Sequence, residues 1–329
     1  MRIMGRPRAL VAVLAACLLL AGCGSGPSQV TTALYLGDRH VSVDEVQGLI
    51  DKAVQEQPAA RQLAQQHKAD MLGREIVRQM IVHQMVTQTA QMDGVVVDPA
   101  QISQVMAQDP LAAPVSATNT DASQLAQQIV YRVRDHREVV SDQLLLQSLG
   151  AQYFDKLTVT FDYTSVVSDD GGANPVSMRE KAFAKAQQMA ADPAAAAKVI
   201  QADSASGQQT GVGEKVPAVQ APDLAGMVLF GVEPGTVVAF QPSSAQPVWI
   251  VAVVRARDLT TPQAVDQTSE PTSTQLAAIG QRLLQTYLQQ AGLKVNPRYG
   301  VWDPAGLALA PSEAETTGLV LPVKGPAQP

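Results

Sequence analysis

The sequence predicts an α+β protein that is mainly helical. Apolar residues recur at helical spacing over most of residues 42–149 and again over 274–291, and β-branched residues alternate in short runs between these regions. This order predicts a helical first part, a small α+β domain inserted after it, and a C-terminal helix that returns to the first part.

The N-terminal residues have the features of an export signal. Three arginines precede an apolar run over 9–20, which suits a secretory signal and is short for a helix that spans a bilayer. The run ends in Leu20-Ala21-Gly22-Cys23, which resembles the bacterial lipobox. We therefore expect residues 1–22 to be a lipoprotein signal peptide.

Cys23 is the candidate lipidation site. Two acyl chains on one cysteine anchor a protein stably, whereas a single chain is marginal. We expect the mature protein to lie outside the cytoplasm, anchored through acylated Cys23 to the lipid bilayer of the bacterial cell membrane. Residues 23–33, which begin with a polar stretch rich in glycine and serine, are expected to form a flexible tether. A plain cleaved signal peptide, with Cys23 incidental, is the alternative.

The charge of the chain argues against nucleic acid as a partner. Removing residues 1–22 leaves 21 of the 24 basic residues against 30 acidic ones, so the formal net charge moves from -6 to -9. A chain this acidic repels phosphate backbones.

Residues 34–157 are expected to form a helical domain, which opens with a short extended segment that turns at Gly37-Asp38. Ser42 and Glu45 have the spacing of a capping box, in which each side chain binds the free backbone N–H of the other residue. A helix is therefore expected to begin at this point.

Two longer helices are expected in the same domain. Apolar residues at i, i+4 spacing predict a helix over 70–92 that ends at Asp93-Gly94. A second long helix is expected over 122–149, with Gly150 as its stop.

Residues 158–259 are expected to form the inserted domain. The alternating, β-branched segment 157–167 predicts its first strand. The elements expected next are helices over 177–191 and 193–202, a loop over 204–213, a helix over 223–230, and a hairpin of strands over 237–240 and 248–254.

The C-terminal part is expected to contribute one strong helix. Residues 260–273 are polar and contain two prolines, as in a linker. Residues 274–304 hold a helix over 274–291, whose apolar face is expected to pack on the N-terminal helices rather than on the inserted domain. Residues 305–329 have few large apolar side chains and are expected to be disordered.

Three segments are similar to one known family: the opening turn and helix at 37–46, the helix and following turn at 72–98, and Tyr299-Gly300-Val301-Trp302-Asp303 after the last helix. They resemble the SurA and PrsA group of extracytoplasmic chaperones. The resemblance implies a SurA-like chaperone core made by 34–157 and 274–304, with a parvulin-like domain inserted between them.

The inserted domain resembles a degenerate parvulin. Its second half, from Val212 to Arg255, has a Gly-rich turn, a short helix and Glu233-Pro234-Gly235 before a closing hairpin. Parvulins carry one histidine on the first strand and another on the closing strand, and in this register the two positions hold Tyr163 and Trp249. All four histidines precede the domain, so the resemblance implies that it has no isomerase activity, and no catalytic residue is assigned.

The candidate client-binding residues are Met80, Met85, Tyr163 and Trp249. Flexible methionine side chains suit a surface that accepts many sequences, although core packing is the alternative for each. His83 is a candidate pH-sensitive contact, with a hydrogen-bonded boundary residue as the alternative. No metal-binding or nucleotide-binding motif is present, and we expect neither a metal nor a cofactor.

These observations predict a membrane-anchored extracytoplasmic chaperone that binds unfolded or newly exported polypeptides. One alternative is a solute-binding or structural lipoprotein of the cell envelope; a transporter-type binding protein would show two repeated α/β lobes. The other alternative is an active parvulin-type peptidyl-prolyl isomerase.

Replacing Cys23 with alanine should release the protein from membranes or leave its precursor unprocessed, because no thiol remains to carry the lipid. Membrane fractionation and mass spectrometry of the mature N-terminus test this expectation. An unmodified thiol on Cys23 of the mature wild-type protein would contradict it.

Overall fold

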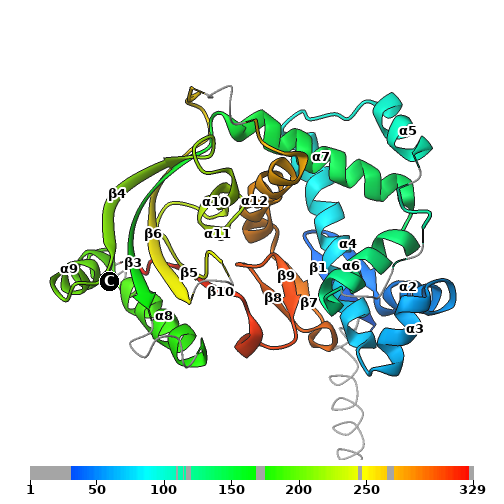
Figure 1. Ribbon diagram of the computed structural model, residues 1–329, viewed down its shortest axis with the longest axis horizontal. Coiled ribbons are helices and arrows are strands. Elements are labelled where there is room, and N and C mark those ends of the chain that lie inside the picture. Colours follow the sequence, from blue (N-terminus) through cyan, green and yellow to red (C-terminus); the bar gives the residue numbers. More distant parts are fainter. Residues whose placement is uncertain are drawn as a thin grey trace, which may run out of the picture.

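The computed structural model describes residues 31–108, 110–113, 115, 120–167, 175–243, 247–264 and 270–325. They form a mixed α+β fold with about 52% helix and 21% strand, which confirms the expected class at this level. A helical half and a sheet half lie side by side, with one long C-terminal helix between them (Figure 1). The expected signal peptide, Cys23 and most of the expected tether lie outside the described residues.

The helical half begins with a small sheet of order β2-β1-β7. β1 (Thr32–Leu36) and β2 (Arg39–Ser42) form a hairpin around Gly37, whose φ of 57° favours glycine. The short strand β7 (Lys294–Val295) pairs with the other side of β1. β1 thus begins within the last two residues of the expected tether.

The described helices of this half confirm the helix start expected after Ser42 and the long helix expected to end before Asp93. The Ser42 hydroxyl accepts the Glu45 N–H at 3.1 Å, and the Glu45 carboxylate accepts the Ser42 N–H at 2.7 Å, so the capping box is confirmed. The helices are α2 (Val43–Glu56), α3 (Pro58–Gln65), α4 (Ala69–Met92), α5 (Pro99–Ala107), α6 (Ala122–Val133) and α7 (His136–Phe154).

The prediction of a single helix over 122–149 is wrong, because the helix is interrupted between α6 and α7 at residues 134–135. Arg134 has an extended backbone with ψ of 169°, and the Asp135 carboxylate accepts the N–H of Glu138 at 2.9 Å. An aspartate that caps backbone N–H groups begins a new helix in a new direction. The apolar spacing continues across the break and therefore did not reveal it.

Gly150 is not the helix stop that the sequence predicted. α7 continues to Phe154, and Gly150 lies where α7 crosses α12 (Ser273–Ala291). A Cβ atom on Gly150 would lie 1.9 Å from the carbonyl oxygen of Leu276, and one on Gly280 would lie 2.0 Å from that of Leu146. A glycine on each helix therefore lets the two backbones come into direct contact.

α12 is shared between the two halves. It packs on α4 and α7, as expected, but also on the short helices α10 (Pro222–Ala225) and α11 (Val228–Gly231) of the sheet half. Leu284 and Leu288 belong to the core of the helical half, whereas Ile279 belongs to a core of the sheet half. The expected packing of α12 on the helical half is confirmed, but the expectation that α12 does not pack on the sheet half is wrong.

The sheet half is built on five antiparallel strands in the order β10-β5-β6-β3-β4. Helices α8 (Pro175–Met189) and α9 (Ala195–Ala205) share an apolar core with one face, and α10 and α11 share one with the other. The strands are β3 (Thr158–Val167), β4 (Thr210–Pro217), β5 (Thr236–Phe240), β6 (Val248–Asp258) and β10 (Gly318–Pro322).

β4 begins inside the loop expected over 204–213. Glycines suggested a turn there, but Gly213, with φ of 67°, lies at an irregularity in the β3–β4 pairing. Its N–H donates to Asp162 at 2.7 Å, and the same carboxylate pairs with Arg255 at 2.7 Å. Strand β4, paired with β3, thus replaces the last four residues of the expected loop.

The expectation of a disordered tail over 305–329 is wrong for the described residues to 325. β8 (Val301–Asp303) pairs with β9 (Ala308–Ala310), and β10 then joins the large sheet. The 1%-exposed Asp303 accepts hydrogen bonds from the backbone N–H and the hydroxyl of Thr317, at 2.6 and 2.7 Å. The tail is therefore ordered by partners distant in sequence, which its composition did not indicate.

Replacing Gly280 with alanine should lower the stability of the fold. In an ordinary helix this change stabilises by up to about 1 kcal/mol, but here the added methyl group meets the Leu146 carbonyl oxygen, and overpacking costs about 1–3 kcal/mol. Urea-unfolding midpoints measure the effect. Gly48→Ala, in α2 with nothing within 4 Å of its Cβ position, is the matched control and should stabilise. Equal effects of the two changes would contradict the close crossing.

Candidate functional site

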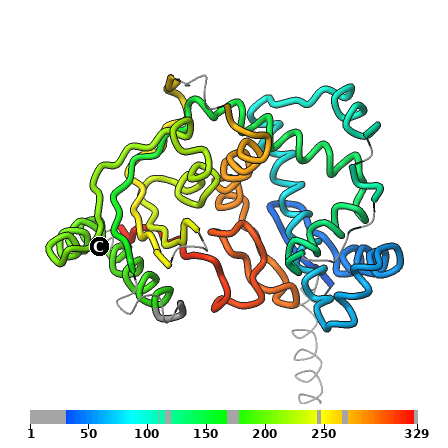
Figure 2. The backbone as a smooth tube through the Cα atoms, in the orientation of Figure 1, coloured from blue at the N-terminus to red at the C-terminus, as the bar shows by residue number. Residues whose placement is uncertain are grey.

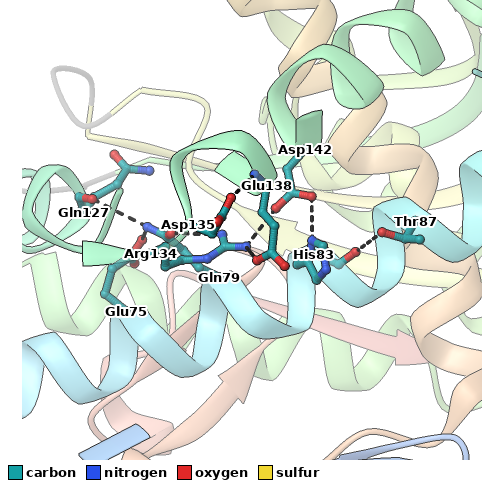
Figure 3. A network of polar contacts seen from close by, with 9 residues as sticks. All are labelled: Glu75, Gln79, His83, Thr87, Gln127, Arg134, Asp135, Glu138 and Asp142. Carbon is teal, nitrogen blue, oxygen red and sulfur yellow. Dashed lines mark hydrogen bonds and ion pairs between the residues drawn. The ribbon is translucent and has the colours of Figure 1, made fainter. Parts of the chain in front are cut away.

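A network of buried polar side chains joins α4, α6 and α7 (Figure 3). Arg134, at the break between α6 and α7, donates to Asp142 at 3.0 Å and to the Gln79 side-chain oxygen at 3.2 Å. The second oxygen of Asp142 lies 2.7 Å from Nδ1 of His83. Arg134 and Asp142 are 8% and 7% exposed, so each charge needs the other to offset its loss of water.

The α4 side of this network is a row of polar residues one turn apart. Glu75, Gln79 and His83 follow one another at i, i+4, which places them on one side of the helix. The Gln79 amide donates to Glu75 at 2.8 Å, which leaves its oxygen for Arg134. This row was visible in the sequence as polar residues within an apolar pattern, but its partners Arg134 and Asp142 were not.

His83 is the group in this network whose charge depends most on its surroundings. Its hydrogen bond to Asp142 raises its pKa above the ordinary value, and the negative charge of Asp142 adds to the effect, while burial and the charge of Arg134 oppose it. His136 has a different setting, since its Nε2 lies 3.0 Å from the carbonyl oxygen of Arg132.

A depression of about 250 Å³ opens beside the network, between α4, α6, α7 and the first half of α12. Side-chain amides can each donate and accept hydrogen bonds, so they can bind a polypeptide backbone whatever its side chains. The amides of Gln127, Gln143 and Gln281 lie in its wall, beside the buried amide of Gln79, which is already bonded to Glu75 and Arg134.

A second depression, of about 310 Å³, lies on the opposite side of α12, where the ends of α4 and α7 meet β6. Met92 is 59% exposed at this depression, beside Leu259 and Tyr287. The Tyr153 hydroxyl donates to Asp93 at 3.0 Å in the same wall. Both depressions have polar and apolar side chains in their walls, and the second adds an exposed methionine.

Arg257 adds a buried cation to the second depression. Its Nε donates to the carbonyl oxygen of Phe230 at 2.8 Å, but its buried Nη2 has no hydrogen-bond partner among the described residues. Burial lowers the pKa of this guanidinium. A buried donor without a partner is costly, so this guanidinium lowers the stability of the fold at this point.

The two candidate methionines are not the exposed ones. Met85 is 1% exposed in the core of the helical half, and Met80 is half-buried against it. The proposal of Met85 as a client contact is therefore wrong, since packing between helices covers it. Met92, at the end of α4, has the exposure that the hypothesis required.

Tyr163 and Trp249 do not form one site. On paired strands Tyr163 lies opposite Ala252 and Trp249 opposite Val166, and residues three apart on a strand point to opposite faces. Trp249 is 5% exposed and packs edge-on against Phe183 of α8 at 5.6 Å, whereas Tyr163 packs on the α10 and α11 side. Trp249 is therefore a core residue, and its assignment as a client contact is wrong.

The described residues contain no cluster of three or more His, Cys, Asp or Glu side chains arranged to hold a metal ion. Within the same parts of the chain, no helix has the length and apolar character needed to cross a membrane. Comparison with protein-family models gives no match, and comparison with curated proteins gives no matching sequence.

The stabilising contribution of His83 should be greatest at acidic pH. Because its folded-state pKa is raised, this contribution is fully present below the unfolded pKa of about 6.5 and is lost as pH rises through the folded value. The difference in unfolding free energy between wild type and His83→Asn should therefore be larger at acidic than at alkaline pH.

Urea unfolding across this pH range, with His136→Asn as the control, measures the difference. A gap between wild type and His83→Asn that does not change with pH would show that the Asp142 contact leaves the pKa of His83 unchanged.

Proposed function

We propose that the protein is an extracytoplasmic chaperone, lipid-anchored at Cys23, that binds unfolded or newly exported polypeptides and does not catalyse prolyl isomerisation. The observation that carries the proposal is the return of α12 to α4 and α7, with four of the five strands of the large sheet between α7 and α12 in the sequence. This is the chain order that the resemblance to the SurA and PrsA group implies.

The two depressions beside α12 support binding without strong sequence preference. One presents amide groups suited to a peptide backbone, and the other presents Met92 and Tyr287, suited to apolar side chains. An unfolded polypeptide offers both kinds of group along any segment. Flexible methionine contacts adapt to side chains of different shape.

The absence of isomerase activity is supported by the two positions that the parvulin resemblance singles out. A twisted prolyl amide is stabilised by polar groups that converge on one small cleft. Tyr163 and Trp249 lie on opposite faces of the sheet, and Trp249 is buried, so these two side chains do not converge.

The solute-binding alternative is disfavoured by the strand pairing. Repeated βαβ units place neighbouring strands parallel to each other. Every strand pair formed by the described residues is antiparallel.

The mature chain carrying Cys23→Ser should suppress aggregation of a chemically unfolded protein at near-stoichiometric ratios. Met92→Glu should raise the concentration needed by roughly tenfold, since burying a methionine side chain contributes about 1.5–3 kcal/mol and the new charge opposes that burial. Light scattering during dilution of the unfolded protein from denaturant measures both effects.

Val96→Glu is the matched control, because Val96 is 84% exposed and lies outside the lining of the depression. It should act like the parent chain. Failure of the folded parent chain to suppress aggregation would reject the proposal. Prolyl-peptide isomerisation measured on the same chain should stay at the uncatalysed rate; a higher rate that falls on Tyr163→Phe would favour the isomerase alternative.

A further inference from the structure

β10 occupies an edge of the large sheet although it comes from the C-terminal segment of the chain. Figure 2 follows this segment from the end of α12 to the sheet. All five residues of β10 pair with β5, from Gly318 opposite Phe240 to Pro322 opposite Thr236. Because every residue of β5 is buried, an extended chain in the place of β10 is needed to keep this edge from water.

The side chains of β10 show what this edge accepts. Leu319 and Leu321 pack into the core that α8 and α9 share with the sheet, and Val320 packs into the core on the opposite face. The edge thus binds an extended segment through its backbone and takes apolar side chains on both faces. Backbone hydrogen bonds supply affinity in this mode, and pockets for alternate side chains supply selectivity.

The segment before β10 is held differently from β10 itself. Asp303 accepts two hydrogen bonds from Thr317, and Arg179 of α8 donates to the carbonyl oxygens of Glu313 and Thr316 at 3.1 and 3.2 Å. The Arg179 guanidinium also lies 4.1 Å from the centre of the Phe183 ring. Side-chain clamps therefore fix the chain as far as Thr317.

From Gly318 onward, backbone hydrogen bonds and apolar contacts hold the described chain. After the ladder with β5, Val323 N–H donates to Gly235 at 2.8 Å and Lys324 N–H donates to Ala190 at 3.0 Å. An extended chain of another sequence can make the same backbone bonds. Gly318 lies between the part of the chain held by side-chain hydrogen bonds and the part held by backbone hydrogen bonds. A Cβ atom at Gly318 would lie 2.6 Å from the Ala239 carbonyl oxygen.

We propose that the edge of β5 is a second polypeptide-binding site, which β10 fills within the same chain. An extended client segment with alternating apolar side chains fills it when β10 detaches. The identity of this ligand as a client rests on the proposed chaperone function. The clamps at Thr316 and Thr317 keep the tail attached while β10 is displaced, so the strand can return when the client leaves.

The test uses a fluorescent peptide with the sequence of residues 316–325 and three forms of the mature chain, all carrying Cys23→Ser. The first has no other change, the second carries Leu319→Asp and Leu321→Asp to weaken β10, and the third carries Thr236→Cys and Pro322→Cys. Residues 236 and 322 lie opposite each other on paired strands, so oxidation of the two introduced cysteines to a disulfide fixes β10 in place.

The weakened form should bind the peptide at least tenfold more tightly than the unchanged form, measured by fluorescence anisotropy, because its own strand competes less. The oxidised form should not bind, and reduction should restore binding to that of the unchanged form. A peptide with aspartate in place of both leucines is the ligand control and should bind none of the three.

A folded weakened form that binds no better than the oxidised form would overturn the inference. Should circular dichroism show that the weakened form is unfolded, hydrogen exchange on the unchanged chain decides. Amides of 318–321 should then exchange faster than those of 248–254, and equal protection would overturn the inference. Peptide binding is measured separately from aggregation suppression. If the weakened form suppresses aggregation but does not bind the peptide, the inference about the β5 edge is rejected and the proposed chaperone function is not.

Discussion

The close contact of α7 with α12 at Gly150 and Gly280 is the constraint on which the two halves depend. Each glycine leaves room for a carbonyl oxygen of the other helix, so the backbones approach more closely than side chains would allow. This crossing fixes α12 against the helical half. The other side of α12 then offers Ile279 and its neighbours to α10 and α11, which joins the sheet half to the same helix.

Arg282 completes this junction from α12. Its guanidinium donates to the carbonyl oxygen of Gly226 in the sheet half at 2.8 Å and to that of Ala305 in the C-terminal segment at 2.9 Å. Burial lowers the pKa of Arg282 to about 10, and the nearby charge of Asp303 opposes this shift, so the side chain stays charged at neutral pH. One cation thereby ties α12, the sheet half and the tail together, and it favours a fixed arrangement of the surfaces around α12.

The fixed arrangement matters for the proposed function because both depressions border α12. A chaperone needs a stable frame and contacts that tolerate many sequences. Here the frame is supplied by backbone contact and buried charges, whereas the contacts are supplied by glutamine amides and by an exposed methionine. The polar network around Arg134 holds the wall of one depression in place, and the hydrogen bond between Asp142 and His83 in the same network raises the pKa of this histidine.

Features that depend on neighbouring residues could be predicted from the sequence. The capping box at Ser42, the end of α4 before Asp93, and strands β3, β5 and β6 follow from local hydrogen bonds and from side-chain periodicity. Features that depend on distant partners were decided only by tertiary structure. Periodicity marks an apolar face but not its partner, so it could not place Met85 and Trp249 in the cores or leave Met92 exposed. The C-terminal tail forms β10 because β5, Asp303 and Arg179 supply bonds that the residues of the tail cannot make among themselves.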